Sequence, residues 1–212
     1  MPDRPIHIGV LAMQGAFAEH VAAFEQIGVR ASEVRTEAEL RDVDAIVIPG
    51  GESTAIRKAL DRGRLLEPLR ARIAAGLPAF GTCAGLIVLA DAPDDGAPPC
   101  FGLFDVDVVR NGFGRQVFSF EGTVELSGGG VSRAQLPGVF IRAPRITRIG
   151  PAVEVVGAIA GGVHAGEPVV VRQGWLLGAT FHPELTGDRA VHEMFVDMVR
   201  DAARGVVSHE DS

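Results

Sequence analysis

The chain has 212 residues and a net charge of −7, with 47% hydrophobic and 22% charged residues. This is ordinary globular composition, and the length suits one sizeable core. Because acidic residues outnumber basic ones and no long cluster of lysine and arginine occurs, nucleic acids and anionic membranes are poor candidate partners. No apolar run approaches the ~20 residues that span a bilayer, so we expect neither a membrane segment nor a signal peptide.

In the first half, short apolar segments alternate with amphipathic ones. We expect strands at residues 6–13, 29–34, 43–51 and 77–82, and helices at 14–28, 53–63 and 65–76. In the first of these helices, Phe17, Val21 and Phe24 share one face, and Gly28 is a plausible stop. Strands that alternate with helices every ~10–15 residues indicate a parallel sheet with helices on both faces.

The second half is rich in β-branched residues, with Gly or Pro between short segments. We expect strands, some of them antiparallel, at residues 104–111, 116–126, 138–143, 146–150, 153–160, 167–174 and 175–181. A last helix at 187–205 buries a stripe of Val191, Phe195, Met198 and Val199. The sequence thus predicts an α/β protein with a mostly parallel central sheet, flanked by helices, and extra antiparallel strands in its second half. Residues 1–205 form a single domain, and residues 206–212 form a frayed tail.

The chain contains two cysteines, Cys83 and Cys100. So few cysteines predict no disulfide framework and a reducing, cytoplasmic setting. His192 and Glu193 begin like the zinc motif H-E-x-x-H, but Val196 stands at its last position. We therefore expect no metal site, and the sequence indicates no cofactor.

The segment Gly81-Thr82-Cys83-Ala84-Gly85 fits the pattern G-x-C-x-G, the cysteine form of a nucleophile elbow. A nucleophile at a tight strand-to-helix turn needs small neighbours, because the chain doubles back closely. The helix that follows favours a thiolate, and the amide of Ala84 is placed to donate to an oxyanion. The alternative is a buried cysteine that acts as a small apolar residue in a glycine-rich turn.

A base for this cysteine is offered by "ATFHPELTGD", where His182 and Glu184 follow a predicted strand. In extended chain, residues i and i+2 point to the same side, so Glu184 can lie beside His182 and orient its ring. The alternative is an exposed His-Pro-Glu turn before a helix. Since Cys83 also ends a strand, and sites gather at the carboxyl ends of parallel strands, these side chains can meet at one edge of the sheet.

The turn "IPGGES" follows the third predicted strand. It lacks the G-K-[ST] ending of a phosphate loop, so it predicts either a second oxyanion donor or a plain turn. Ser53 is interpreted as the N-cap of the next helix. Arg110 and Arg142 each follow a short apolar strand, and each either binds a carboxylate or lies solvated at the surface.

Together these stretches resemble the class I, triad-type glutamine amidotransferases, and among them the glutaminase subunits of pyridoxal 5'-phosphate synthases. The resemblance covers nearly the whole chain and rests on "IGVLAMQGAFAEH", "IPGGESTAIRK", "FGTCAGLIVLA", "VVRNGFGRQVFSFE", "VFIRAP" and "ATFHPELTGD". Ile87 stands where most other triad glutaminases carry Gln. Two positions depart from the family pattern, Gly112 for the common Ser and Met13 for the usual Leu.

The resemblance implies a flavodoxin-like sheet and a role for each matching residue. Cys83 is the nucleophile, His182 the general base and Glu184 its orienting carboxylate. L-Glutamine is bound by Gly51, Glu52, Ser53, Arg110, Ile141 and Arg142, and the oxyanion by the backbone N–H groups of Gly51 and Ala84. We expect hydrolysis of L-glutamine to L-glutamate and ammonia, which passes to a separate, barrel-shaped synthase subunit that makes pyridoxal 5'-phosphate.

Two alternatives stay open at this point. The chain is either another cysteine hydrolase of this fold, which acts on γ-glutamyl compounds, or a catalytically silent regulatory subunit. The segment "MQGAF" is either part of the contact with the synthase or only the first strand-to-helix turn. Because one oxyanion donor is typically worth ~10²–10³ in rate, a glycine turn that must move into place predicts low activity of the chain alone.

Overall fold

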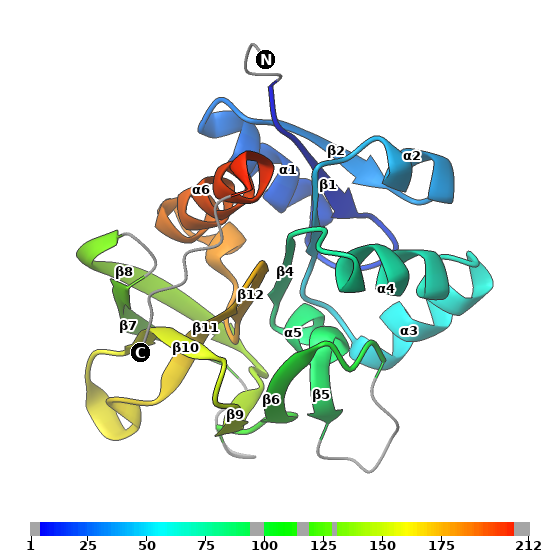
Figure 1. Ribbon diagram of the computed structural model, residues 1–212. Coiled ribbons are helices and arrows are strands. Elements are labelled where there is room, and N and C mark those ends of the chain that lie inside the picture. The colour runs from blue at the N-terminus through cyan, green and yellow to red at the C-terminus, as the bar shows by residue number, and fades with distance from the viewer. Residues whose placement is uncertain (1–4, 94–99, 114–118, 129–130, 206–212) are drawn as a thin grey trace.

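The computed structural model describes residues 5–93, 100–113, 119–128 and 131–205. Within these residues, one sheet of nine strands runs through the molecule in the order β2-β1-β3-β4-β12-β11-β10-β7-β8 (Figure 1). Its parallel part consists of β2 (Arg30–Val34), β1 (His7–Leu11), β3 (Ala45–Ile48), β4 (Ala79–Thr82) and β12 (Leu176–Ala179). Its antiparallel part adds β11 (Pro168–Gln173), β10 (Glu154–Ile159), β7 (Ser119–Gly128) and β8 (Val131–Ile141).

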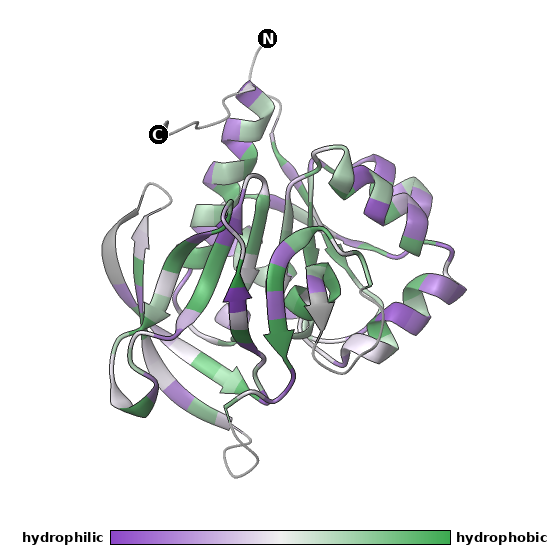
Figure 2. Ribbon diagram, turned by 60° about the horizontal axis from the view of Figure 1, so that its bottom comes forward, coloured by the Kyte–Doolittle hydropathy of each residue, from purple (hydrophilic) through white to green (hydrophobic). Residues whose placement is uncertain are grey.

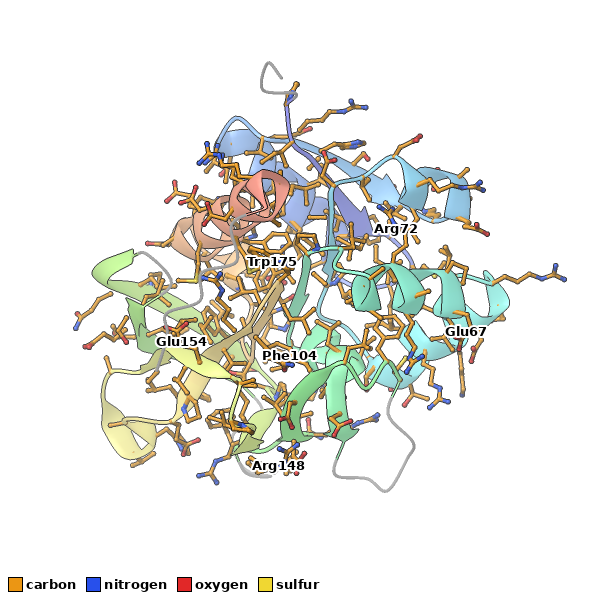
Figure 3. The ribbon with its side chains drawn as sticks, viewed as in Figure 1. Glu67, Arg72, Phe104, Arg148, Glu154 and Trp175 are labelled. Atoms are coloured by element: carbon orange, nitrogen blue, oxygen red, sulfur yellow. The ribbon has the colours of Figure 1, made fainter. Side chains whose placement is uncertain are left out.

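A smaller sheet, in the order β5-β6-β9, consists of β5 (Ala90–Pro93), β6 (Phe104–Val109) and β9 (Arg145–Ile149). It packs against the large sheet through Phe104, whose side chain is fully buried; a Cβ atom on Gly178 of β12 would lie 3.0 Å from its ring. Figure 3 shows Phe104 in the interior and Arg148 of β9 at the periphery. There Arg148 forms ion pairs with Asp105 and Asp107 of β6.

Helices cover both faces of the parallel strands. On one face lie α1 (Phe17–Gln26) and α6 (Ala190–Arg204), which touch through Phe24 and Phe195. On the other face lie α2 (Glu37–Arg41), α3 (Ser53–Arg62), α4 (Leu66–Ala74) and α5 (Ala84–Leu89) (Figure 1). Two short 3₁₀ turns complete the fold, η1 (Gly162–His164) and η2 (Pro183–Leu185).

Two hydrophobic cores follow from this arrangement. In β3, Ala45 and Val47 face the α1/α6 core, and Ile46 and Ile48 face the core beneath α3, α4 and α5. A strand buried on both faces needs a continuous apolar sequence, which explains why β3 and β4 show no polar alternation. Figure 2 shows largely apolar strands in the middle of the molecule, and hydrophilic segments along the helices around them.

The fold class predicted from the sequence is confirmed, including the antiparallel strands of the second half and the buried stripe of α6. One helix was missed. The five residues of α2 are too short for a hydrophobic period, but its start has a capping box: Thr36 accepts from the Glu39 amide, and Glu39 accepts from the Thr36 amide. No helix within the described residues is long and apolar enough to cross a membrane. The tail predicted at 206–212 lies outside the described residues.

Candidate active site

The sequence-predicted site lies at the carboxyl ends of three neighbouring parallel strands. Strand β4 lies between β3 and β12, and Gly81 is level with Ile48 of β3 and Gly178 of β12. The chain therefore leaves the sheet at the same edge toward Gly50 after β3, Cys83 after β4 and His182 after β12. Three segments far apart in sequence are brought together by register alone, as expected for the carboxyl edge of a parallel sheet.

Cys83 occupies a strained turn between β4 and α5. Its φ of 49° and ψ of −107° lie in a region that residues other than glycine rarely adopt. The turn is held by the Cys83 amide, which donates to the Ala179 carbonyl at 2.8 Å. Its glycines are required by close approach, because a Cβ atom on Gly85 would lie 1.9 Å from the Ile48 carbonyl oxygen. The expected elbow geometry is present, and the free Cys83 thiol is 6% exposed, with its sulfur 3.8 Å from the Ile141 carbonyl oxygen.

His182 and Glu184 form a buried pair. Nδ1 of His182 lies 2.7 Å from Oε1 of Glu184, and Glu184 is 4% exposed. The extended backbone expected here from the sequence was wrong: residues Pro183–Leu185 form the 3₁₀ turn η2. Pro183 fixes φ at the start of that turn, and the turn brings the carboxylate back to the ring. The expected contact is thus made through a different backbone path.

The charge state of His182 follows from its neighbours. Burial favours the neutral ring, but hydrogen bonds to Cys83 and Glu184 and the charges of both partners raise the pKa of His182 to about 10. Burial also opposes ionisation of Glu184, yet the His20 and His182 rings hold the pKa of that carboxyl below its usual value. Because Nδ1 faces Glu184, Nε2 is the ring nitrogen left to exchange a proton with the thiol of Cys83. At neutral pH the site thus places an imidazolium beside the cysteine.

The glycine turn after β3 lies directly against this pair. A Cβ atom on Gly50 would lie 2.3 Å from Cε1 of His182 and 3.3 Å from Cβ of Cys83. The Gly50 amide donates to Oγ1 of Thr82 at 3.0 Å. On its outer side the turn touches the segment before α1, where a Cβ atom on Gly15 would lie 1.7 Å from the Gly50 carbonyl oxygen. The "MQGAF" segment therefore supports the glycine turn.

The residues expected to bind glutamine lie around this turn. Glu52 is the N-cap of α3, where its carboxylate accepts from the amides of Thr54 and Ala55, both at 2.9 Å. The prediction of Ser53 as N-cap was wrong, because the longer Glu52 side chain reaches both amides, and Ser53 is the first helical residue. Arg110 donates to Oγ1 of Thr54 at 3.3 Å and so joins the same group. Partial burial raises the pKa of Glu52, but the hydrogen bonds from Thr54 and Ala55 and the charge of Arg110 outweigh it, and this pKa is lowered.

Ile141 and Arg142 approach from the end of β8. The Ile141 carbonyl faces the Cys83 sulfur, and Arg142 is exposed, with a left-handed φ of 44°. Gly112 shows why this chain departs from the family pattern near Arg110. Its amide donates to the Ala143 carbonyl at 3.1 Å, and a Cβ atom there would lie 2.3 Å from Cβ of Arg145. Glycine therefore allows the segment after Arg110 to pack closely on the start of β9.

Sequence reasoning missed two residues of the site, His20 and Thr82. His20 of α1 is fully buried, and its Nε2 lies 3.4 Å from Oε2 of Glu184 and 3.2 Å from Oγ1 of Thr82. Its Nδ1 lies 3.1 Å from Nε2 of His192, which the sequence singled out only as part of an incomplete zinc motif. The available signal was periodicity: His20 lies three residues after Phe17 and four before Phe24, on the buried face of α1.

Comparison with known proteins assigns this arrangement to a family. The model of the SNO glutamine amidotransferase family matches residues 10–201. The chain belongs to the SNO glutamine amidotransferase family. Two relatives named pyridoxal 5'-phosphate synthase subunit PdxT are similar to this chain over almost their whole lengths. That of Acidothermus cellulolyticus is 52% identical, over 96% of this chain and 99% of its own length. That of Thermobifida fusca is 54% identical, over 94% of this chain and all of its own length.

Solved structures agree with the SNO assignment. A crystal structure described as a glutamine amidotransferase is 42% identical with a TM-score of 0.82, and covers 91% of this chain and 98% of its own. A glutamine amidotransferase from Thermotoga maritima shares the fold alone, with 12% identity and a TM-score of 0.57, over 96% of this chain and 86% of its own. The family resemblance drawn from the sequence is confirmed.

Proposed function

We propose that this chain is the glutaminase subunit of a pyridoxal 5'-phosphate synthase. It hydrolyses L-glutamine to L-glutamate and ammonia, and it passes the ammonia to a separate synthase subunit. The family and the relatives at 52% and 54% identity over nearly their whole lengths support this assignment. The observation that carries the chemistry is the strained Cys83 beside the buried His182–Glu184 pair. One sheet built from both halves of the chain supports a single glutaminase domain over residues 1–205.

The reaction begins with Cys83 as a thiolate opposite the His182 imidazolium. The sulfur attacks the side-chain amide carbon of L-glutamine, and the carbonyl electron pair moves onto oxygen. His182 gives its Nε2 proton to the amide nitrogen, the C–N bond breaks, and ammonia leaves a glutamyl thioester on Cys83. The neutral ring then takes a proton from water, the hydroxide attacks the thioester, and glutamate leaves as the sulfur regains its electron pair. Glu184 stabilises the imidazolium, and when the ring is neutral it keeps the remaining hydrogen on Nδ1.

The negative charge on oxygen needs donors that are already in place. Ala84 supplies one, because it is the first residue of α5 and follows the nucleophile directly. Gly51 supplies the second from the turn after β3. The Gly50 amide is excluded from this role because it donates to Thr82. Since the Gly50–Gly51 turn is backed by the segment at Gly15, a partner that contacts that segment can change the position of the second donor.

Charged groups at the rim fit an amino-acid substrate. Arg110 and Arg142 carry the positive charge for the α-carboxylate of glutamine, since guanidinium binds carboxylates in a fork. Glu52 is ionised and, with Gly51 and Ser53, lines the turn where the α-ammonium group lies. Ile141 places its carbonyl next to the reacting sulfur. No cofactor and no metal ion enters this scheme.

The ammonia requires a second protein, because in water it would be protonated and lose its nucleophilicity. We assign the acceptor reaction to the barrel-shaped subunit of the synthase, and we expect "MQGAF", Met13 to Phe17, at its contact. The reaction also requires a free thiol, which agrees with a reducing compartment, the cytoplasm. Nothing in the scheme calls for nucleic acid or a membrane.

The decisive experiment measures glutamate release from L-glutamine by the chain alone, with the synthase subunit, and with Cys83→Ala. We expect low activity alone, a large increase with the synthase, and none with Cys83→Ala. Preferred hydrolysis of γ-glutamyl peptides over glutamine would instead identify another cysteine hydrolase of this fold. Failure of a glutamine-analogue electrophile to label Cys83 with the synthase present would identify a silent regulatory subunit.

A further inference from the structure

A buried histidine outside the Cys83–His182–Glu184 set faces the far side of the Glu184 carboxylate. Glu184 has two oxygens: Oε1 faces His182, and Oε2 lies 3.4 Å from Nε2 of His20. Both side chains of the second pair are wholly shielded from solvent. A carboxylate held at one oxygen can rotate about its last bond, whereas a carboxylate held at both is fixed in its plane. His20 therefore stands where a group that orients Glu184 must stand.

The hydrogen-bond pattern assigns the tautomer of His20. Its Nε2 lies 3.4 Å from a carboxylate oxygen, which repels a bare nitrogen lone pair, so Nε2 carries the hydrogen and donates it to Oγ1 of Thr82. Nδ1 of a neutral ring is then a bare acceptor and takes the Nε2–H of His192 at 3.1 Å. The chain of donors ends at Nδ1 of His192, which has no hydrogen-bond partner within the described residues. The direction of donation thus runs from His192 through His20 to Oγ1 of Thr82, and the same N–H is turned toward Oε2 of Glu184, which likewise has no hydrogen-bond partner among the residues that the structure describes.

The charge balance requires that His20 stays neutral. Burial lowers the pKa of His20, and the charge of Glu184 offsets this only in part. Burial also holds the pKa of His192 well below its usual value. The titratable and charged groups that act on His20 are Glu184 and His182 beside η2, Glu19 of its own helix, and His192 and Arg189 at α6. Glu184 consequently keeps its full negative charge for His182, while its second oxygen, which has no hydrogen-bond partner in the described part of the chain, faces a neutral N–H at 3.4 Å.

His20 also contacts the support of the glycine turn. Its Nε2 lies 3.2 Å from Oγ1 of Thr82, and the same oxygen accepts the Gly50 amide at 3.0 Å. Thr82 directly precedes Cys83 and is fully buried. One imidazole N–H therefore bonds the hydroxyl that holds the Gly50–Gly51 turn and also faces the carboxylate that orients the base.

We propose that His20 is a positioning residue for glutamine hydrolysis, which holds Glu184 in plane behind His182 and anchors the Gly50–Gly51 turn through Thr82. This inference rests on the proposed function of the chain. His20 acts through Glu184 and Thr82 and does not touch the substrate. Its loss should leave glutamine binding intact and impair the chemical steps, because the base and the turn lose a common support.

The test uses three variants. His20→Leu removes the donor and keeps an apolar side chain of similar bulk, and His20→Gln keeps an N–H near the Nε2 position. His7→Leu is the matched control: His7 is also a buried histidine with two ring contacts, to Ser32 and Asp42, but it starts β1 at the opposite edge of the sheet. For each, kcat and KM are measured across pH with the synthase subunit present. The rate of Cys83 alkylation by iodoacetamide is measured across pH on the chain alone, by peptide mass spectrometry.

His20→Leu is expected to lower kcat by about tenfold to a hundredfold, the cost of removing a buried donor that Thr82 accepts and Glu184 faces, with KM little changed. Without its second partner Glu184 protonates more readily, so the acid limb of kcat moves to higher pH. The imidazolium is then supported less well, and the alkylation profile moves to higher pH as well. His20→Gln should restore most of kcat and both profiles. His7→Leu should lower the melting temperature and leave both profiles at their wild-type positions.

Wild-type pH profiles of kcat and of alkylation in His20→Leu would overturn the proposal. Equal losses of kcat in His20→Leu and His20→Gln, with both profiles unmoved, would also overturn it, because they would show that His20 contributes packing alone. If His20→Leu does not fold, His20→Asn is used instead, because the asparagine amide reaches the position of Nδ1 and not that of Nε2. Wild-type pH profiles in His20→Asn would likewise overturn the proposal. A wild-type chain that releases no glutamate with the synthase contradicts the proposed function instead. The alkylation profile needs no glutamine turnover and decides the role of His20 in that case as well.

Discussion

Substitution of Gly50 by alanine tests the close fit between the glycine turn and the reacting pair. The backbone of Gly50 is not in the left-handed region, so alanine is compatible with its dihedral angles. The added Cβ atom is the only perturbation, and it would lie 2.3 Å from Cε1 and 2.9 Å from Nδ1 of His182. Ordinary carbon contacts lie at about 3.5–4.0 Å, so the ring or the turn must move by more than about 1 Å.

The His182 ring cannot move away freely. Its Nδ1 is tied to Glu184 at 2.7 Å, and only 10% of its side chain is exposed. Displacement of a reacting group by about 1 Å costs on the order of 10²-fold in rate. Overpacking of this kind also costs about 1–3 kcal/mol of folding free energy. We therefore expect Gly50→Ala to fold, to melt at a lower temperature and to lose about 10²-fold in kcat/KM.

The assay is glutamate release with the synthase subunit present, together with a thermal melt of the chain. Gly161→Ala is the matched control, because Gly161 has extended backbone with φ of −162° and a Cβ atom there meets nothing within 4 Å. It should keep wild-type kcat/KM and melting temperature. Wild-type kcat/KM in Gly50→Ala would show that the turn and the imidazole are not in contact in the working enzyme, and the reasoning would be wrong.

Three further predictions concern charge and protonation. Glu184→Gln should lower the pKa of His182 from about 10, seen by NMR titration of the ring, and should lower kcat by at least ~10²-fold; an unmoved titration would contradict the pairing. His20 and His192 are buried, and burial lowers the pKa of each ring. Below pH 6.5 the unfolded state therefore binds more protons than the folded state, so the free energy of unfolding decreases as the pH is lowered. Urea unfolding at pH 7.5 and 5.5 should show a smaller fall in His192→Leu, and an equal fall would exclude His192 as a cause. Burial raises the pKa of Cys100 to about 11, so iodoacetamide at pH 7 should label Cys83 first, and faster labelling of Cys100 would contradict this.

The parallel part of the fold was predictable because its strands are buried on both faces. A segment such as Ala45–Ile48 has no polar residue, and it is followed by glycines and then by an amphipathic helix. That pattern indicates a crossover to a parallel strand, and parallel strands place all of their carboxyl ends at one edge of the sheet. The triad candidates follow from this edge alone, since each lies just beyond a strand. The sequence could not specify the 3₁₀ turn at Pro183–Leu185, because the pairing of Glu184 with His182 allows extended and turned backbone alike.

His20 was not predictable for a related reason. A histidine on the apolar face of a helix is usually a buried residue whose partners lie elsewhere in the chain, and these partners are 62 and 172 residues away in Thr82 and His192. Glu52 illustrates the opposite error. The short Ser53 is the more common N-cap, but the first turn of α3 begins one residue earlier, and only the three-dimensional course of the chain decides between them.

The buried polar network explains how one cysteine can be held at a strained dihedral angle without loss of order around it. Cys83 is fixed by the hydrogen bond that its amide donates to the Ala179 carbonyl, by the close packing of Gly85 on Ile48 and by the His182 ring against Gly50. These supports come from both strands that flank β4, namely β3 and β12, so no single loop movement can relax the turn. The ionised Glu184 is in turn the group that makes burial of His182 possible, with Oε1 bonded to His182 and Oε2 facing the His20 N–H at 3.4 Å. The strain at the nucleophile and the satisfaction of a carboxylate on the other side of the base are therefore linked, and a change at His20 should be felt at Cys83.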